Sequence, residues 1–200
     1  MTLDQLRPVA DRLLGPWVTA ADRLGLSPDQ VSVIAFGAAI AAGVAFAVAT
    51  PVAYALGAFL VFMNGWLDIV DGALARKQLV ASEGGDLLDH VLDRYADILI
   101  IAGLASGVDA YALGLAAVTG VLMTSYLGTQ IQAVGLGREY GGLLGRADRL
   151  ALAGVTGVVA AVYPAPIVAD LGVVGLLLVL FTVVGHLTAF QRFWGAWQDL

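Results

Sequence analysis

The chain has 200 residues, of which 60% are hydrophobic and only 13% are charged, and its mean hydropathy is +0.86. A soluble domain is typically about half apolar and about a quarter charged, so these values exclude an ordinary soluble globule and also a disordered chain. The net charge of −6 argues against a nucleic-acid partner, and the absence of cysteine excludes disulfides and thiolate chemistry. The length fits one compact unit, in which sixteen acidic side chains require an explanation.

The first 26 residues form a separate segment with an amphipathic pattern. Apolar residues recur there at steps of three and four, and charged residues occupy the other faces. The apolar positions are Leu3, Leu6, Ala10, Leu13, Trp17, Ala20 and Leu24. This pattern predicts a juxtamembrane helix that lies in the membrane interface, although a helix packed on the rest of the protein would show the same periodicity.

Six apolar runs follow, and most approach the length of about 20 residues that a membrane-crossing helix needs. They cover residues 31–49, 52–67, 87–107, 110–134, 143–163 and 167–190. Ser27 reads as an N-cap, with Pro28 at the first helical position and Gln30 completing a capping box. We therefore expect an all-α integral membrane protein, in which residues 1–26 form the amphipathic interfacial helix and residues 27–200 form one domain of six transmembrane helices.

The basic residues indicate the orientation of this domain. With six spans, both termini lie on one side of the membrane, and all ten basic residues fall on or near that side. They are Arg7, Arg12, Arg23, Arg76, Lys77, Arg94, Arg138, Arg146, Arg149 and Arg192. The three turns on the opposite side carry neither Lys nor Arg. The positive-inside rule then predicts a multi-pass protein of the cell membrane with its basic face in the cytoplasm.

Four aspartates interrupt the apolar pattern near the cytoplasmic side. Asp68 and Asp71 are three residues apart near the end of the second run. Asp89 and Asp93 are four residues apart near the start of the third run. Each pair therefore shares one face of a helix. Residues 77–84 form a short connection, which predicts that the two helices are antiparallel neighbours and that the two pairs converge.

Ionised carboxylates are costly in a membrane, at roughly 2.5–3.5 kcal/mol for each one at a helix centre. Divalent cations offset this cost, and oxygen ligands favour Mg²⁺, Mn²⁺ or Ca²⁺, whereas a chain with two histidines and no cysteine is poorly suited to zinc. Small residues flank the pairs at Gly72, Ala75, Gly84 and Gly85. Together with Arg76 they leave room and charge for a pyrophosphate-bearing substrate. The other interpretation is that the aspartates only form buried ion pairs.

These residues also match a known signature. The segment reads Asp68-x-x-Asp71-Gly72-x-x-Ala75-Arg76, then eight residues, then Gly85-x-x-x-Asp89-x-x-x-Asp93. Both the fixed residues and their spacing resemble the motif of the CDP-alcohol phosphotransferase family. An amphipathic N-terminal helix followed by six spans is similar to that family as well, so the resemblance covers nearly the whole chain.

The resemblance implies a phospholipid-synthesis enzyme. Such an enzyme transfers a phosphatidyl or archaetidyl group from a CDP-linked lipid, CDP-diacylglycerol or CDP-archaeol, to a small alcohol and releases CMP. By the same resemblance, a two-metal site of Mg²⁺ or Mn²⁺ is held by Asp68, Asp71, Asp89 and Asp93. Asp93 is also the implied general base, which removes the proton from the attacking hydroxyl. The residues implied to contact the CDP group are Asp68, Asp71, Gly72, Ala75, Arg76 and Gly85.

The second half of the chain resembles one branch of the family. Ser125-Tyr126 and residues 145–150 are similar to members that use inositol phosphate or glycerol phosphate, including those that make archaeal ether lipids. The residues expected to bind the acceptor are Arg138, Arg146 and Arg149. The basic residues that usually follow Ser-Tyr are absent from residues 127–132. Glycerol phosphate and inositol phosphate are the expected acceptors, and an unphosphorylated alcohol such as serine stays open.

Other side chains and functions complete the sequence-based expectations. Asn64, one turn before Asp68, is placed to touch the nucleotide, and Asp97 is expected to support Arg94 or to line the acceptor cavity. In a different functional class, cation transporters also use intramembrane carboxylates. The carboxylates of a transporter would lie along a path through the middle of the membrane, whereas the four aspartates of this chain lie toward its cytoplasmic face. We also expect a homodimer within the lipid bilayer.

Overall fold

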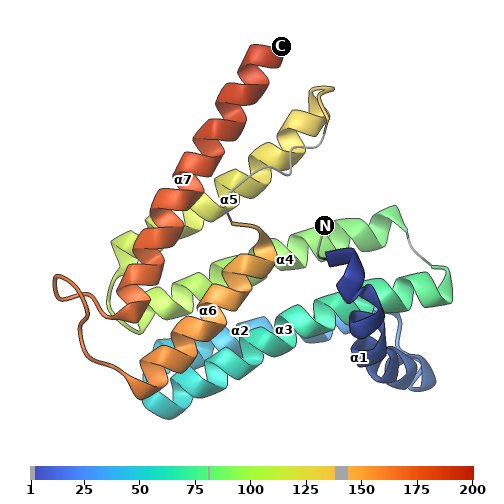
Figure 1. The fold of residues 1–200 in the computed structure, drawn as a ribbon, viewed down its shortest axis with the longest axis horizontal. Helices are drawn as coiled ribbons and strands as arrows, with labels where there is room; N and C mark the ends of the chain where they lie inside the picture. The colour runs from blue at the N-terminus through green and yellow to red at the C-terminus, as the bar shows by residue number, and fades with distance from the viewer. Residues whose placement is uncertain (1–2, 81, 138–143) are drawn as a thin grey trace.

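The computed structural model describes residues 3–80, 82–137 and 144–200, with side chains from residue 13 onward (Figure 1). The described part contains the helices α1 (Leu3–Arg23), α2 (Pro28–Val48), α3 (Pro51–Gln78), α4 (Glu83–Ser106), α5 (Tyr111–Ala133), α6 (Arg146–Val162) and α7 (Val173–Asp199). Between the described helices lie turns, one of which holds a single backbone bridge between Val168 and Leu171. The expected all-α fold is confirmed.

Short capping motifs set the starts of three helices. Ser27 accepts a hydrogen bond from the Gln30 backbone N–H at 3.2 Å, and the Gln30 side chain accepts one from the Ser27 N–H at 2.9 Å. The predicted capping box of α2 is therefore present. Thr50 caps α3 and Ser82 caps α4, each through its hydroxyl oxygen. These caps satisfy N–H groups that a helix leaves without partners at its N-terminus.

Four of the described helices, α2, α3, α5 and α7, are long and apolar enough to cross a bilayer. Together with the exposed apolar residues along their length, this makes the chain a helical membrane protein. Charged residues run through the first half of α4, and α6 has 17 residues. Neither α4 nor α6 combines that length with that composition, so four of the six expected spans are supported by length and composition, and the number six stays a prediction.

Several helix boundaries differ from the expected apolar runs, and the clearest differences are at the end of α3 and the start of α7. α3 continues past residue 67 to Gln78, because hydropathy marks where a helix leaves the hydrocarbon and not where its hydrogen bonding ends. α7 begins at Val173 rather than at residue 167, since Ala169 and Asp170 have positive φ angles of 47° and 64° that turn the chain. The extension of α3 keeps the first pair of aspartates inside a continuous helix.

α2 lies at the centre of the group formed by α2, α3 and α4, because α3 and α4 both pack along it (Figure 1). α6 packs on α3, and α5 pairs with α7. Gly43 of α2 and Gly103 of α4 approach so closely that a Cβ on Gly103 would overlap the Gly43 backbone. Small residues thus allow helices to approach each other closely, as is typical of helix contacts in membrane proteins. Phe46, Leu104 and Phe181 fill the core between the helices.

The N-terminal helix α1 crosses the second half of α3 and buries one face on it. Leu14, Val18 and Ala21 of α1 are buried against Val70 and Leu74 of α3. The packing explains part of the amphipathic periodicity, because one apolar face of α1 is docked on the bundle. A position in the membrane interface stays a prediction.

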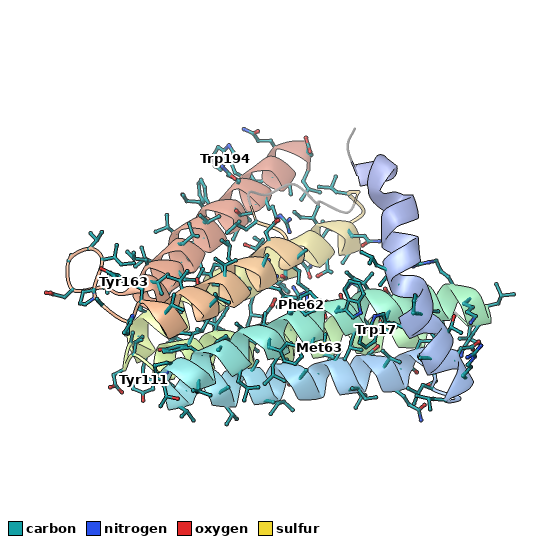
Figure 2. All side chains as sticks on the ribbon, turned by 60° about the horizontal axis from the view of Figure 1, so that its bottom comes forward. Trp17, Phe62, Met63, Tyr111, Tyr163 and Trp194 are labelled. Atoms are coloured by element: carbon teal, nitrogen blue, oxygen red, sulfur yellow. The ribbon has the colours of Figure 1, made fainter. Side chains whose placement is uncertain are left out.

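Polar contacts and exposed aromatic residues complete the description of α1. Lys77 of α3 lies 2.8 Å from Asp22, and Gln78 donates a 3.0 Å hydrogen bond to the same carboxylate. Both contacts stabilise the ionised form and lower the pKa of Asp22. Trp17 is about half exposed at the edge of this contact, where its ring meets that of Trp66 on α3 edge to face. Figure 2 shows Trp17 of α1 toward one end of the molecule and Tyr111 and Tyr163 at the opposite end. Aromatic residues at both ends are typical of a protein that meets two membrane interfaces.

Candidate active site

The carboxylates of the motif come from α3 and α4. The two helices run antiparallel, as expected (Figure 1), but each packs against α2 rather than against the other. One oxygen each from Asp68, Asp71 and Asp89 lies within 4.8 Å of the other two. Asp93, one turn further along α4, stands outside this acidic group. The structure therefore brings together three of the four aspartates.

The acidic group fits a hard divalent cation. It offers three carboxylate oxygens from two helices, which are the donors that Mg²⁺ and Mn²⁺ prefer, and Asp71 is buried at its base. Ser32 of α2 donates a 2.7 Å hydrogen bond to Oδ2 of Asp71 and so fixes the direction of that carboxylate. Sequence reasoning missed Ser32, because it lies within the apolar run of α2 and no motif spacing connects it to the aspartates.

Arg146 connects Asp93 to the acidic group. Its Nη1 lies 2.9 Å from Oδ2 of Asp68, and its Nη2 lies 2.5 Å from Oδ1 of Asp93. Asn64 stands beside them, with Oδ1 3.5 Å from Nη2 of Arg146, while its Nδ2 donates to the carbonyl of Ala35 at 3.0 Å. Arg146, which was expected only at the acceptor, thus reaches the carboxylates from the first turn of α6.

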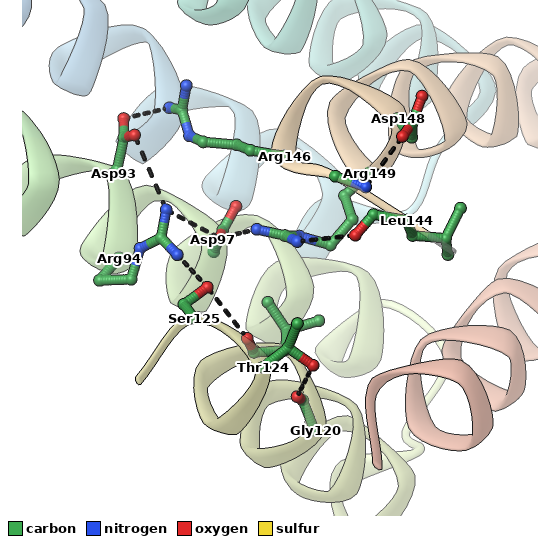
Figure 3. Close-up of polar contacts among 12 residues, drawn as sticks. Asp93, Arg94, Asp97, Gly120, Thr124, Ser125, Leu144, Arg146, Asp148 and Arg149 are labelled. Atoms are coloured by element: carbon green, nitrogen blue, oxygen red, sulfur yellow. Dashed lines mark hydrogen bonds and ion pairs between the residues drawn. The ribbon is translucent and has the colours of Figure 1, made fainter. Parts of the chain in front are cut away.

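A second charged network lies deeper in the bundle (Figure 3). Arg149 of α6 donates a 2.9 Å hydrogen bond to Asp97 of α4, and both side chains are buried. Arg94 lies 3.9 Å from Asp97 and 3.7 Å from Asp93, and it donates to the hydroxyl of Ser125 on α5. Asp97 therefore supports Arg94 as expected, but its shorter contact is with Arg149.

Among the described residues, a cavity of about 910 Å³ is lined mainly by α3 and α6, which pack together beside it. Its walls are almost entirely apolar, with Phe59, Phe62 and Trp66 on α3 and Leu150 on α6. At one end the lining changes to Asp68, Asp93 and Arg146. We refer to it as the apolar cavity. It offers a long apolar surface that ends at charged groups, which is the shape of a site for a lipid with a polar head.

A second cavity, of about 760 Å³, lies between α4, α5, α6 and α7 and is called here the basic cavity. Four arginines line it: Arg94, Arg146, Arg149 and Arg192. Arg192 of α7 also donates to the Thr124 carbonyl at 2.5 Å. Arg94 and Arg192 were not expected at the acceptor, and the signal that could have found them is the rarity of arginine within apolar helices. Four guanidinium groups around one cavity are suited to a phosphorylated ligand.

The remaining expected residues lie near the connection between α3 and α4. Gly72 and Ala75 are half-buried on α3, Arg76 is exposed in its last turn, and Gly85 begins α4. A Cβ on Gly85 would lie 3.2 Å from Oδ1 of Asp29 in α2, so a side chain there would crowd that carboxylate. These four residues lie beside the acidic group and line neither cavity. Arg138, expected at the acceptor, lies outside the described residues.

The comparison with protein families decides the classification. A family model described as CDP-alcohol phosphatidyltransferase matches residues 26–197, which is nearly the whole chain. The chain belongs to this family. The predicted enzyme class, a CDP-alcohol phosphotransferase of phospholipid synthesis, is thereby confirmed.

Individual members of the family are similar over most of the chain. An archaetidylinositol phosphate synthase from Methanothermobacter thermautotrophicus is 32% identical over 199 residues, covering 99% of this chain and 95% of the relative. A phosphatidylinositol phosphate synthase from Mycolicibacterium smegmatis is 32% identical and covers 70% of this chain and 65% of its own length.

Solved structures show the same fold. The crystal structure of a phosphatidylinositol phosphate synthase from Mycobacterium tuberculosis with CDP-DAG bound has a TM-score of 0.79 and 24% identity, covering 93% of this chain and 94% of that one. A second structure of the same enzyme, in complex with manganese and citrate, also has a TM-score of 0.79.

Proposed function

We propose that this enzyme transfers a phosphatidyl or archaetidyl group from a CDP-linked lipid to inositol phosphate and releases CMP. The observation that carries the proposal is the basic cavity, whose four arginines adjoin Asp93. Guanidinium groups bind phosphate oxygens through paired hydrogen bonds, and an unphosphorylated alcohol such as serine or inositol brings no phosphate to them. The relatives named as archaetidylinositol phosphate and phosphatidylinositol phosphate synthases support the choice of inositol phosphate.

The donor lipid would occupy the apolar cavity. Its aromatic and aliphatic walls would hold the lipid chains, and its charged end would place the diphosphate of the donor beside the acidic group. The residues proposed to line the site of the CDP moiety lie in the last turns of α3 and the first turn of α4: Gly72, Ala75, Arg76 and Gly85. The small residues would let the nucleotide approach the helix backbone, and Arg76 would face a phosphate.

Asp68, Asp71 and Asp89 would hold Mg²⁺ or Mn²⁺, with Asp93 as a further ligand. When bound, the metal would neutralise the diphosphate and stabilise the leaving CMP. The manganese in the structure of the Mycobacterium tuberculosis protein is consistent with this assignment.

Asp93 would accept the proton of the acceptor hydroxyl, since its carboxylate is in reach of both cavities. Arg146, Arg149 and Arg192 would hold the phosphate of the acceptor and so point its hydroxyl toward Asp93. Arg138 remains a proposed member of the same set. No covalent intermediate with the protein is required, because the acceptor oxygen replaces CMP directly at phosphorus.

For the membrane arrangement we propose six spans, with α1 in the interface and the active site on the cytoplasmic side. α6 would be about 26 Å long at 1.5 Å per residue, which is close to the thickness of the hydrocarbon. Beyond its exposed first turn, the charged residues of α4 belong to the acidic group or take part in ion pairs, which makes a span of this composition tolerable. Residues 1–26 and 27–200 would form the interfacial helix and the catalytic domain, and a homodimer remains a prediction.

The test is a reaction with defined substrates. Purified protein in detergent, supplied with Mg²⁺ or Mn²⁺ and either CDP-diacylglycerol or CDP-archaeol, should release CMP when inositol phosphate is added. Glycerol phosphate, inositol and serine serve as parallel acceptors, and chelation by EDTA should stop the reaction. Equal or faster CMP release with serine or inositol would contradict the proposal, and the comparison of the two lipids identifies the donor.

A further inference from the structure

Asp93 and Arg146 are the only two described residues that line both cavities, and they are bound to each other. Their side chains are 15% and 16% exposed. The second oxygen of Asp93 faces Arg94 at 3.7 Å, so both carboxylate oxygens have a guanidinium neighbour. Lipid donor and acceptor must meet where the two cavities join. The Asp93–Arg146 ion pair therefore occupies the place where the reacting groups come together.

The same guanidinium also holds an oxygen of the acidic group. Nη1 of Arg146 lies 2.9 Å from Oδ2 of Asp68, which is one of the three aspartates suited to a cation. A divalent ion among these carboxylates would be bound by the negative charge of Asp68, which Arg146 now neutralises. Two cations at neighbouring positions repel each other, and this repulsion is strong where little water screens it. Arg146 and a divalent ion consequently compete for Asp68.

The surroundings of Arg146 favour a side chain that can change partners. It is the first residue of α6, and it lines both cavities. Arg149, in contrast, is paired with Asp97 at a buried position, where separation would leave two uncompensated charges. Arg146 also already lines the basic cavity, so a turn away from the carboxylates would bring it to the acceptor phosphate without movement of a helix.

We propose that Arg146 is a displaceable counter-ion that couples cation binding to acceptor binding. Occupation of the acidic group by a divalent cation releases Arg146 from Asp68 and Asp93. The freed guanidinium then binds the phosphate of the acceptor, and Asp93 becomes available to take the proton of the hydroxyl. The cation and acceptor sites thus bind cooperatively, and the base is exposed only when the cation is present. This inference rests on the proposed function, from which it takes the cation and the phosphorylated acceptor.

The first experiment measures Mn²⁺ affinity by electron paramagnetic resonance of the purified full-length protein, without substrates. Because Arg146 competes with the cation, Arg146→Gln should tighten Mn²⁺ binding by about tenfold, and Arg146→Lys, which keeps the charge but loses the two-pronged contact, should lie between. Arg192→Gln is the matched control, since it removes the same charge from the same cavity but from a residue that contacts the Thr124 carbonyl. An equal tightening in Arg192→Gln, or weaker binding in Arg146→Gln, would overturn the proposal.

The second experiment tests the coupling with inositol phosphate as the probe, using calorimetry with and without Mn²⁺. The wild-type protein should bind inositol phosphate more tightly when Mn²⁺ is present, and inositol phosphate should tighten Mn²⁺ binding by the same factor, as linkage requires. In Arg146→Gln this mutual factor should fall close to one. A factor that persists in the variant would show that the phosphate coordinates the cation directly and would refute the role of Arg146.

The two experiments separate this inference from the proposed function. A wild-type protein that binds neither Mn²⁺ nor inositol phosphate would contradict the proposed function itself. A protein that binds both, but whose Mn²⁺ affinity is unchanged in Arg146→Gln, would leave the function intact and reject only the exchange of partners by Arg146.

Discussion

The two cavities of this protein have similar volumes, about 910 and 760 Å³, but opposite linings. The apolar cavity lies between two helices and is walled by aromatic and aliphatic side chains. The basic cavity lies among four helices and is lined by four arginines. An enzyme that joins a lipid to a water-soluble anion needs both kinds of surface, and a single mixed cavity would bury charges against lipid chains at a high cost. Separate cavities avoid that cost and meet at Asp93 and Arg146.

The largest effect is expected where the cavities meet. Asp93→Asn keeps the size of the side chain but removes the proton acceptor, so turnover should fall by about a thousandfold. Mn²⁺ affinity should change far less, because Asp68, Asp71 and Asp89 form the close group. Two quantities are measured for each protein: the rate of CMP release and the affinity for Mn²⁺. Substantial activity in Asp93→Asn would mean that the base lies elsewhere and that the joined cavities have another purpose.

The next effect concerns the acidic group at the charged end of the apolar cavity. Ser32→Ala removes the 2.7 Å hydrogen bond that orients Asp71, and loss of such supporting contacts typically weakens metal affinity by about 10–100-fold. Ser32→Thr retains the hydroxyl and should restore most of the affinity. The measurements are the rate of CMP release as a function of metal concentration and the affinity of the protein for Mn²⁺. If the Ser32→Ala variant and the wild-type protein bind Mn²⁺ with equal affinity, the orientation of Asp71 does not depend on its hydrogen bond from Ser32 of α2.

A smaller and more selective effect is expected in the basic cavity. Arg192→Gln should raise the KM for inositol phosphate by about tenfold, the effect of losing one charged hydrogen bond, and should leave the KM for the CDP-lipid unchanged. Steady-state kinetics with each substrate varied in turn provide the test. A rise in the lipid KM alone would reverse the assignment of the two cavities.

The smallest effect is expected from narrowing the apolar cavity. Ala151 is exposed on α6 and lines this cavity, so Ala151→Phe should reduce the space for lipid chains and raise the donor KM by about threefold to tenfold. Ala112→Phe on α5, at another exposed position outside both cavities, is the matched control. The KM for inositol phosphate should stay the same in both variants. An unchanged donor KM in Ala151→Phe would indicate that the chains lie elsewhere, for example in the bilayer.

Local spacing explains why much of the acidic group was predictable. Asp68 and Asp71 share a helix face because they are three residues apart, and a short connection leads to the helix that carries Asp89. The capping box at Ser27 was predictable for the same reason, since its two hydrogen bonds join residues three apart. Contacts between distant segments were not predictable from periodicity. Ser32 reaches Asp71 across 39 positions of the chain.

Helix α4 shows the limits of hydropathy in another way. Its residues Asp89, Asp93 and Asp97 meet the acidic group, Arg146 and Arg149 inside the protein, whereas Glu83 and Asp86 are exposed in its first turn. A window of hydropathy averages the faces of a helix and cannot separate a helix with one charged face from a helix that stays outside the bilayer. The turn before α7 was missed for a related reason, because apolar residues such as Ile167 and Val168 also occur in turns.

By itself, the amino-acid sequence determined the helical membrane class, the family signature and the aspartates that carry it, because these depend on composition and on spacing along one or two helices. Only the tertiary structure decided that Asp93 stands apart from the other three aspartates, that Arg146 bridges it to Asp68, and that Arg94 and Arg192 join the basic cavity. Those arrangements depend on how α4, α5, α6 and α7 pack. Packing follows from the fit of many side chains at once, which no spacing within a single segment records.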